Sequence, residues 1–124
     1  RWLASFPCCY DLCGDGSLLG IPLPGHDHGQ LGLYLPDAGG RPMFLVADAC
    51  WSLPALRDGR LPSCIAGLIN SDQRAYVQTF HQLRILAQRE PAVALIPSHC
   101  TVAWRRLCQS EPAPACGEAG PCMS

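Results

Sequence analysis

The sequence predicts an α/β fold with a mixed sheet, one long helix and a short C-terminal helix. Short apolar runs suited to buried strands stand before and after a segment with helical periodicity, and this order is typical of a βαβ unit. A hydrophobic share of 48% is ordinary for a folded protein, and 124 residues suit one domain.

The strands are predicted from apolar patterns bounded by turn residues. Residues 17–23 and 43–47 are apolar runs, which suit buried strands. Residues 30–35 alternate in character, as a strand does, and residues 92–96 form a further apolar run that Pro97 ends. Residues 1–16 are expected to be irregular.

One long helix is predicted over residues 73–89. Its apolar residues recur at helical spacing, with Asp72 as its expected N-cap and Pro91 beyond its end. The apolar positions that set this spacing are Tyr76, Phe80, Leu83 and Ala87. One long helix is too little to cover both faces of such a sheet.

Three shorter segments complete the chain. Residues 53–57 are expected to form a helical turn within a loop, and residues 101–107 a second helix. Residues 109–124 are rich in Pro, Ala, Gly and Cys, which predicts a disordered tail after a domain spanning residues 1–108.

Charge and cysteine content narrow the class of protein. A net charge of -1 without a basic cluster argues against nucleic acid, and no apolar run approaches the ~20 residues of a membrane span. The nine cysteines cannot all close into internal disulfides, and no Cys-x-x-Cys pair is present. Free thiols in a reducing, cytoplasmic compartment are favoured. A soft-metal site is an alternative, built from one of two cysteine groups, at positions 8, 9 and 13 or 108, 116 and 122.

Three polar residues, His26, Asp48 and His99, each follow a predicted strand. Strand ends meet at one crevice in an open α/β sheet, and ligands bind there. Two imidazoles and a carboxylate suit zinc, with manganese or iron as alternatives. Each residue alone could equally be a turn or a solvated side chain. His28 is a weaker candidate, and His81 is expected on the helix surface.

Four motifs resemble those of the metallo-β-lactamase-fold hydrolases, notably their lactonase-like and glyoxalase II-like branches. They occur in the family's order between residues 10 and 99: Gly14-Asp15-Gly16-Ser17, Pro24-Gly25-His26, Leu45-Val46-Ala47-Asp48-Ala49 and Ile96-Pro97-Ser98-His99. The family fold is an αβ/βα sandwich of two similar halves. The resemblance therefore implies that this chain is the C-terminal half only.

The resemblance also implies a zinc-dependent hydrolase. In the family, the residue matching His26 binds the first metal, the one matching Asp48 bridges both metals, and the one matching His99 binds the second. A hydroxide held by the metals attacks an ester, lactone or thioester carbonyl of a small molecule. Two zinc ions are expected in a complete parent domain, with manganese or iron possible.

Three departures qualify this assignment. The upstream His-x-His-x-Asp-His motif is absent, and Gln30 replaces the second histidine of the loop. Trp51 stands where several lactonases place a tyrosine, which makes it a substrate-pocket candidate. Because the chain begins at Arg1 and not Met, we expect further sequence upstream.

Alone, the chain is therefore expected to bind metal weakly and to be inactive, with a missing N-terminal half or an oligomer as its partner. The alternative is a non-catalytic half-domain, or a degenerate remnant, that serves as an interaction module.

Overall fold

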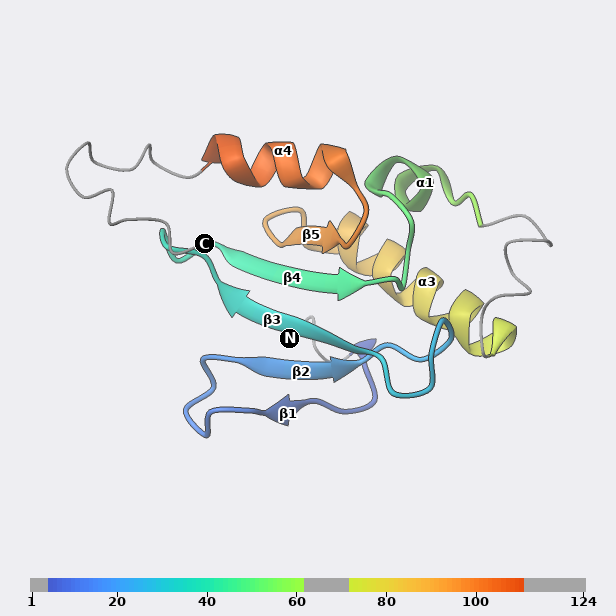
Figure 1. Cartoon of the computed structure of the whole chain (residues 1–124), viewed down its shortest axis with the longest axis horizontal. Helices are drawn as coiled ribbons and strands as arrows, with labels where there is room; N and C mark the ends of the chain where they lie inside the picture. Colours follow the sequence, from blue (N-terminus) through green and yellow to red (C-terminus); the bar gives the residue numbers. More distant parts are fainter. Residues whose placement is uncertain (1–4, 62–71, 111–124) are drawn as a thin grey trace, which may run out of the picture.

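The computed structural model describes residues 5–61 and 72–110. They form one five-stranded sheet in the order β1-β2-β3-β4-β5 (Figure 1). The strands are β1 (Tyr10–Asp11), β2 (Leu19–Pro22), β3 (Leu31–Pro36), β4 (Pro42–Ala47) and β5 (Ala94–Pro97). The helices are α1 (Leu53–Asp58), α3 (Gln73–Arg89) and α4 (Thr101–Ser110).

The sheet is mixed, as predicted. The pairs from β1 to β4 are antiparallel, whereas β4 and β5 pair in parallel across a crossover that contains α1 and α3. This crossover is the predicted βαβ unit. It brings the C-terminal ends of β4 and β5 to the same end of the sheet.

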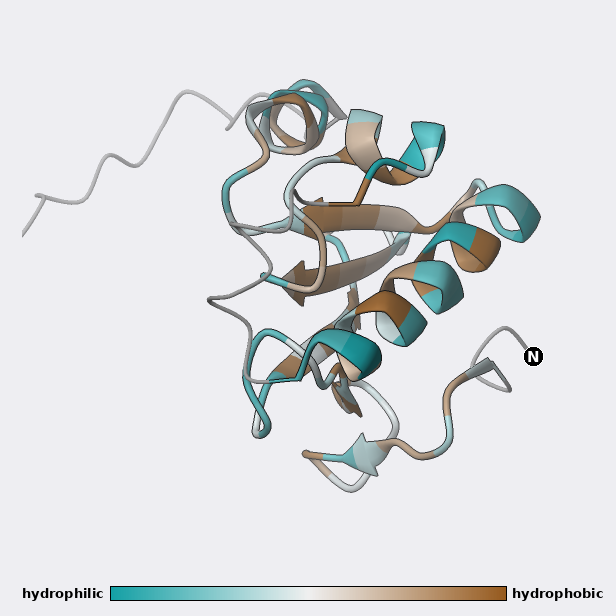
Figure 2. Ribbon diagram, turned by 90° about the vertical axis from the view of Figure 1, so that its right-hand side faces the viewer, coloured by the Kyte–Doolittle hydropathy of each residue, from teal (hydrophilic) through white to brown (hydrophobic). Residues whose placement is uncertain are grey.

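Alternate residues of β4 face two different cores. Phe44 and Val46 are fully buried in the main core, which also contains Phe80 and Leu83 of α3. Met43 and Leu45 point to the opposite face, where they pack with residues of β5 and α4. In Figure 2 the central strands are mostly brown, whereas the helices carry both brown and teal. Helix α4 thus covers part of the second face, for which the sequence offered no long helix.

Side-chain caps set where the helices begin. The Asp72 carboxylate accepts a hydrogen bond from the backbone N–H of Ala75 at 3.1 Å, which confirms it as the N-cap of α3. Ser52 caps α1 in the same way. Gly59 ends α1 in the left-handed conformation that glycine adopts without strain.

Three local expectations differ from the structure. Tyr10 and Asp11 form a short strand inside the segment expected to be irregular, because the Asp11 carboxylate accepts from the N–H groups of Gly14 and Gly16 and closes a turn onto β2. Helix α1 is longer than the expected turn by one residue, and α4 runs to Ser110. Residues 109 and 110, expected to begin the disordered tail, belong to α4, and the rest of that predicted tail, residues 111–124, lies outside the described residues. Cys64 also lies outside them. Among the described residues, no helix is long and apolar enough to cross a membrane.

Candidate metal centre

Asp48 follows β4 at a point where the strand is distorted. The preceding residue, Ala47, has a positive φ of 51°, and the β4–β5 register shifts between Leu45 and Ala47. The Ala47 carbonyl accepts a hydrogen bond from the N–H of Ser98 at 3.0 Å, which holds the distorted strand end against the residue that precedes His99. A left-handed conformation is unfavourable for alanine, so this contact stabilises a geometry that the chain would not adopt unaided.

His99 lies in the turn between β5 and α4. Pro97 ends the strand, and the N–H of Cys100 donates to its carbonyl at 3.4 Å. Trp104 of α4 donates its indole N–H to the Ser98 carbonyl at 3.3 Å, so the helix anchors the turn. The His99 side chain is 84% exposed, and its Nε2 atom lies 3.5 Å from Oδ1 of Asp48.

His26 lies in the loop between β2 and β3, and this loop is fixed to helix α3. The N–H of Asp72 donates to the Gly25 carbonyl at 3.0 Å, and the Thr79 hydroxyl donates to the Pro24 carbonyl at 2.8 Å. Gly25 is buried against the backbone of Tyr76 with a φ of 136°, where no side chain would fit. This placement puts Nε2 of His26 3.5 Å from Oδ2 of Asp48.

The three residues predicted at strand ends therefore meet. The Asp48 carboxylate is partly exposed and lies between two imidazoles, with a different oxygen facing each one. Nitrogen and carboxylate donors of this kind match those of zinc sites. Within residues 5–61 and 72–110, however, no three His, Cys, Asp or Glu side chains converge to hold one ion. The geometry is that of two half-sites, His26 with Asp48 and His99 with Asp48, which share the Asp48 carboxylate.

Gln30 connects two parts of this site, which the sequence did not reveal. Its Nε2 donates to the Leu23 carbonyl at 3.0 Å, and its Oε1 accepts from the N–H of Asp48 at 3.3 Å. The side chain thus ties the segment leading to the His26 loop to the residue that both histidines face. In the sequence, Gln30 stood out only as a departure from the family motif.

Two buried polar groups lie among the core residues near Asp48. Tyr76 is 1% exposed, and its hydroxyl has no hydrogen-bond partner among the described residues. Desolvation raises the pKa of Tyr76 to about 12, and electrostatic interactions with the nearby Cys50 and Asp48 add to this increase. Burial, with Cys100 adding to it, raises the pKa of the Cys50 thiol to about 12. Both groups are thus neutral at physiological pH.

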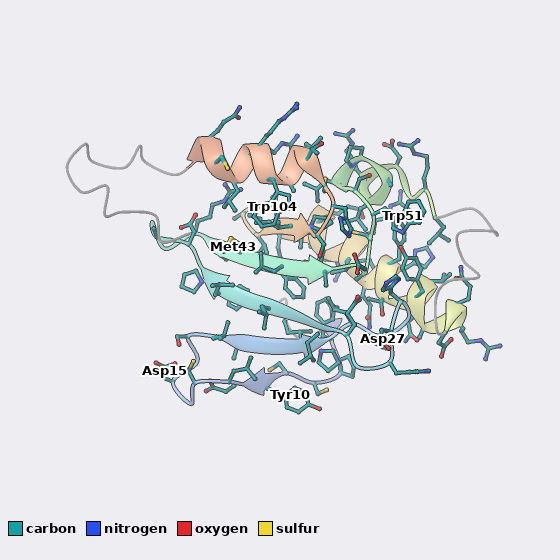
Figure 3. The ribbon with its side chains drawn as sticks, viewed as in Figure 1. Tyr10, Asp15, Asp27, Met43, Trp51 and Trp104 are labelled. Carbon is teal, nitrogen blue, oxygen red and sulfur yellow. The ribbon has the colours of Figure 1, made fainter. Side chains whose placement is uncertain are left out.

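The other sequence candidates lie outside this cluster. Trp51 stands three residues after Asp48 in the sequence, and it is 51% exposed. In Figure 3 it is labelled beyond the end of β4. His28 and His81 are exposed and form no ion pair with a described residue. The thiols at positions 8, 9, 13 and 108 are exposed and unpaired. The described residues thus contain no cysteine metal site, while Cys116 and Cys122 lie outside them.

Comparison with known proteins shows the class to which this arrangement is similar. The chain resembles the metallo-β-lactamase-fold hydrolases over about 77% of its length, as its four motifs predicted. No family model matches the chain.

Within that class, the similar proteins are lactonases. The chain is 30% identical over 95 residues to the N-acyl homoserine lactonase AttM of Rhizobium radiobacter. It is 32% identical over 97 residues to the AttM lactonase of Azorhizobium caulinodans. Each alignment covers 77% of this chain but 34% of the relative, so the chain spans about a third of the length of these lactonases.

Solved structures share the fold. One is an N-acyl homoserine lactone hydrolase with the product N-hexanoyl-L-homoserine bound at its catalytic metal centre. It matches with a TM-score of 0.60 and 14% identity, over 79% of this chain and 36% of that one. A quorum-quenching N-acyl homoserine lactone lactonase matches with a TM-score of 0.58 and 15% identity, over 76% and 35%. The α/β fold with a mixed sheet is therefore confirmed as a portion of the lactonase fold.

Proposed function

We propose that this chain is the C-terminal portion of a metal-dependent hydrolase that opens a lactone or a related ester or thioester. The observation that carries the proposal is the Asp48 carboxylate, which has His26 on one oxygen and His99 on the other, each at 3.5 Å. The likeness to lactonases supports the lactone as substrate.

The donor set of the site fits a divalent metal such as zinc, with manganese or iron as alternatives. His26 would contribute to one metal position and His99 to the other, with Asp48 shared between them. These residues would hold a metal whose chemistry there would be to polarise a carbonyl and to lower the pKa of bound water. The protein's own part is to hold these donors: Gln30 fixes the Asp48 backbone, and Thr79 fixes the His26 loop.

Among the described residues, each half-site has two donors, whereas a hydrolytic zinc ion usually has three protein ligands. The remaining ligands would come from a missing N-terminal half or from an oligomer partner. Trp51, exposed and three residues after Asp48 in the sequence, is the candidate to contact substrate. The partner would thus supply ligands, and this chain would supply the shared carboxylate.

Zinc titration of the 124-residue chain by calorimetry tests this proposal. We expect weak binding that His26→Ala and His99→Ala each reduce, while His81→Ala, an exposed histidine outside the site, leaves it unchanged. Lactone and thioester hydrolysis should be undetectable in the isolated chain. Robust turnover by the chain alone, or zinc binding insensitive to both site variants, would contradict the proposal.

A second candidate function is an interaction module without catalysis. The second face of the sheet favours it, because Leu31 is 42% exposed and Leu33 and Leu35 are only partly buried there. An apolar face of this kind is typical of a protein contact. Size-exclusion chromatography discriminates: the module should elute as an oligomer, and a compact monomer counts against it.

A further inference from the structure

A cavity of about 310 Å³ lies along β5, enclosed by α1, α3 and α4. In Figure 1, β5 is the last strand of the sheet, with α1 and α4 on its outer side and α3 behind it. The walls are mostly apolar and include Leu56, Leu95 and Ala103. None of His26, Asp48 and His99 lines it. The volume is within the range of small-molecule sites, and the cavity is separate from the candidate metal centre.

The cavity also gathers positive charge. Arg41, Arg57, Arg84 and Arg106 line it, which is four of the chain's nine basic residues, and no acidic residue among the described ones does. Nε of Arg57 lies 3.7 Å from Asp58 at the surface. The other three arginines form no ion pair with any described residue. The cavity is therefore cationic without an internal counter-charge.

Arg84 is the arginine whose position most requires a partner. Its guanidinium lies against Gly59, the residue that caps the C-terminus of α1. Its Nε atom is buried with no hydrogen-bond partner among the described residues. A buried, unpaired donor on a charged group destabilises the fold, and a bound anion would relieve that cost. Arginine also presents a planar fork of N–H groups that matches a carboxylate.

We propose that this cavity binds an amphipathic carboxylate, with the carboxylate on Arg84 and Arg106 and an aliphatic chain along the apolar wall of β5. The apolar lining favours a ligand with a hydrocarbon body over an inorganic anion. The uncompensated arginines favour an anion over a neutral lipid-like molecule. The site is independent of hydrolysis, because it shares none of the three candidate metal ligands.

Calorimetric titration of the 124-residue chain with octanoate, octanol and acetate tests this inference. Octanoate carries both features of the ligand, whereas octanol lacks the charge and acetate lacks the chain. We expect octanoate to bind roughly ten- to hundred-fold more tightly than either. Equal affinity for octanol would show that the arginines contribute nothing and that the site is only an apolar cavity. Equal affinity for acetate would show that the apolar wall contributes nothing and that the binding is only to surface charge. Either result would overturn the proposal.

Substitutions locate the binding. Arg84→Met and Arg106→Met each remove a charge but keep an unbranched apolar side chain. Each should lower the affinity for octanoate roughly ten-fold and leave the affinity for octanol unchanged. Arg105→Met on the same helix is the control, because Arg105 is exposed and does not line the cavity. If Arg84→Met fails to fold by circular dichroism, the exposed Arg106 decides alone. Octanoate affinity that Arg105→Met lowers as much as the lining variants would overturn the proposal.

Discussion

Gly25→Ala tests whether the contact of the His26 loop with α3 holds the site together. An added Cβ would lie 2.6 Å from Cβ of Tyr76 and closer still to its backbone, at a φ of 136°. The loop would have to leave the helix. It would then lose the hydrogen bonds to Pro24 and Gly25 that Thr79 and Asp72 donate.

The cost can be worked from these contacts. Backbone strain at this φ contributes about 1–3 kcal/mol, and each lost hydrogen bond about 0.5–1.5 kcal/mol. The free energy of unfolding should fall by roughly 2–6 kcal/mol, a large part of the stability of a typical domain. Because His26 follows Gly25 directly, zinc affinity should fall in any fraction that still folds.

Urea unfolding followed by circular dichroism gives the measurement, and two other glycines separate the causes. Gly16 has a φ of 76° but open space around it, so Gly16→Ala carries only backbone strain of about 1–2 kcal/mol. Gly29 has open space and no positive φ, and Gly29→Ala should be within about 0.5 kcal/mol of the unmodified chain. If Gly25→Ala is no more destabilising than Gly16→Ala, the packing argument is wrong.

Substitutions at three further positions probe the strand end and the groups near it. Ala47→Gly should leave stability unchanged or raise it by up to about 1 kcal/mol in urea, because it relieves the left-handed strain before Asp48, whereas Ala47→Val should lower it. Tyr76→Phe should stabilise by about 1 kcal/mol at pH 8, since it removes an unpaired buried hydroxyl. The pKa of Tyr76 is about 12 in the native state and 10.0 in the unfolded chain, so the native state keeps its proton to higher pH. The free energy of unfolding should therefore fall as the pH rises from about 10 to 12. Tyr76→Phe should remove that part of the fall, measured as urea midpoints. Gln30→Leu should cost about 1–3 kcal/mol and weaken zinc binding by calorimetry, whereas the exposed Gln78→Leu should do neither.

Local patterns predicted most of the elements, because periodicity and caps act within a few residues. The bounds of α3, residues 73–89, are those expected from its apolar spacing and from Asp72. The strand at Tyr10–Asp11 was missed because its order depends on the Asp11 carboxylate and not on an apolar pattern.

The site was predictable where it obeyed a rule about strand ends. His26, Asp48 and His99 each follow a strand, and the sheet brings them together. Other contacts between distant segments, which do not follow from where strands end, leave no such signal in the sequence. The bridge from Gln30 to Asp48 and the cavity shared by Arg41 and Arg106 depend on how elements pack, and residue spacing does not encode that.

The parallel pairing of β4 with β5 also sets an order of assembly. The antiparallel pairs up to β4 close through short connections, whereas β5 joins only after the long crossover through α1 and α3 has folded back. Closing a long loop costs more conformational entropy than closing a short one, and strand pairing across it is therefore slower. Refolding should therefore form the antiparallel strands first and place both imidazoles late, because the His26 loop is fixed to α3 and His99 follows β5. Two imidazoles beside Asp48 would then report that the crossover and the last strand have docked.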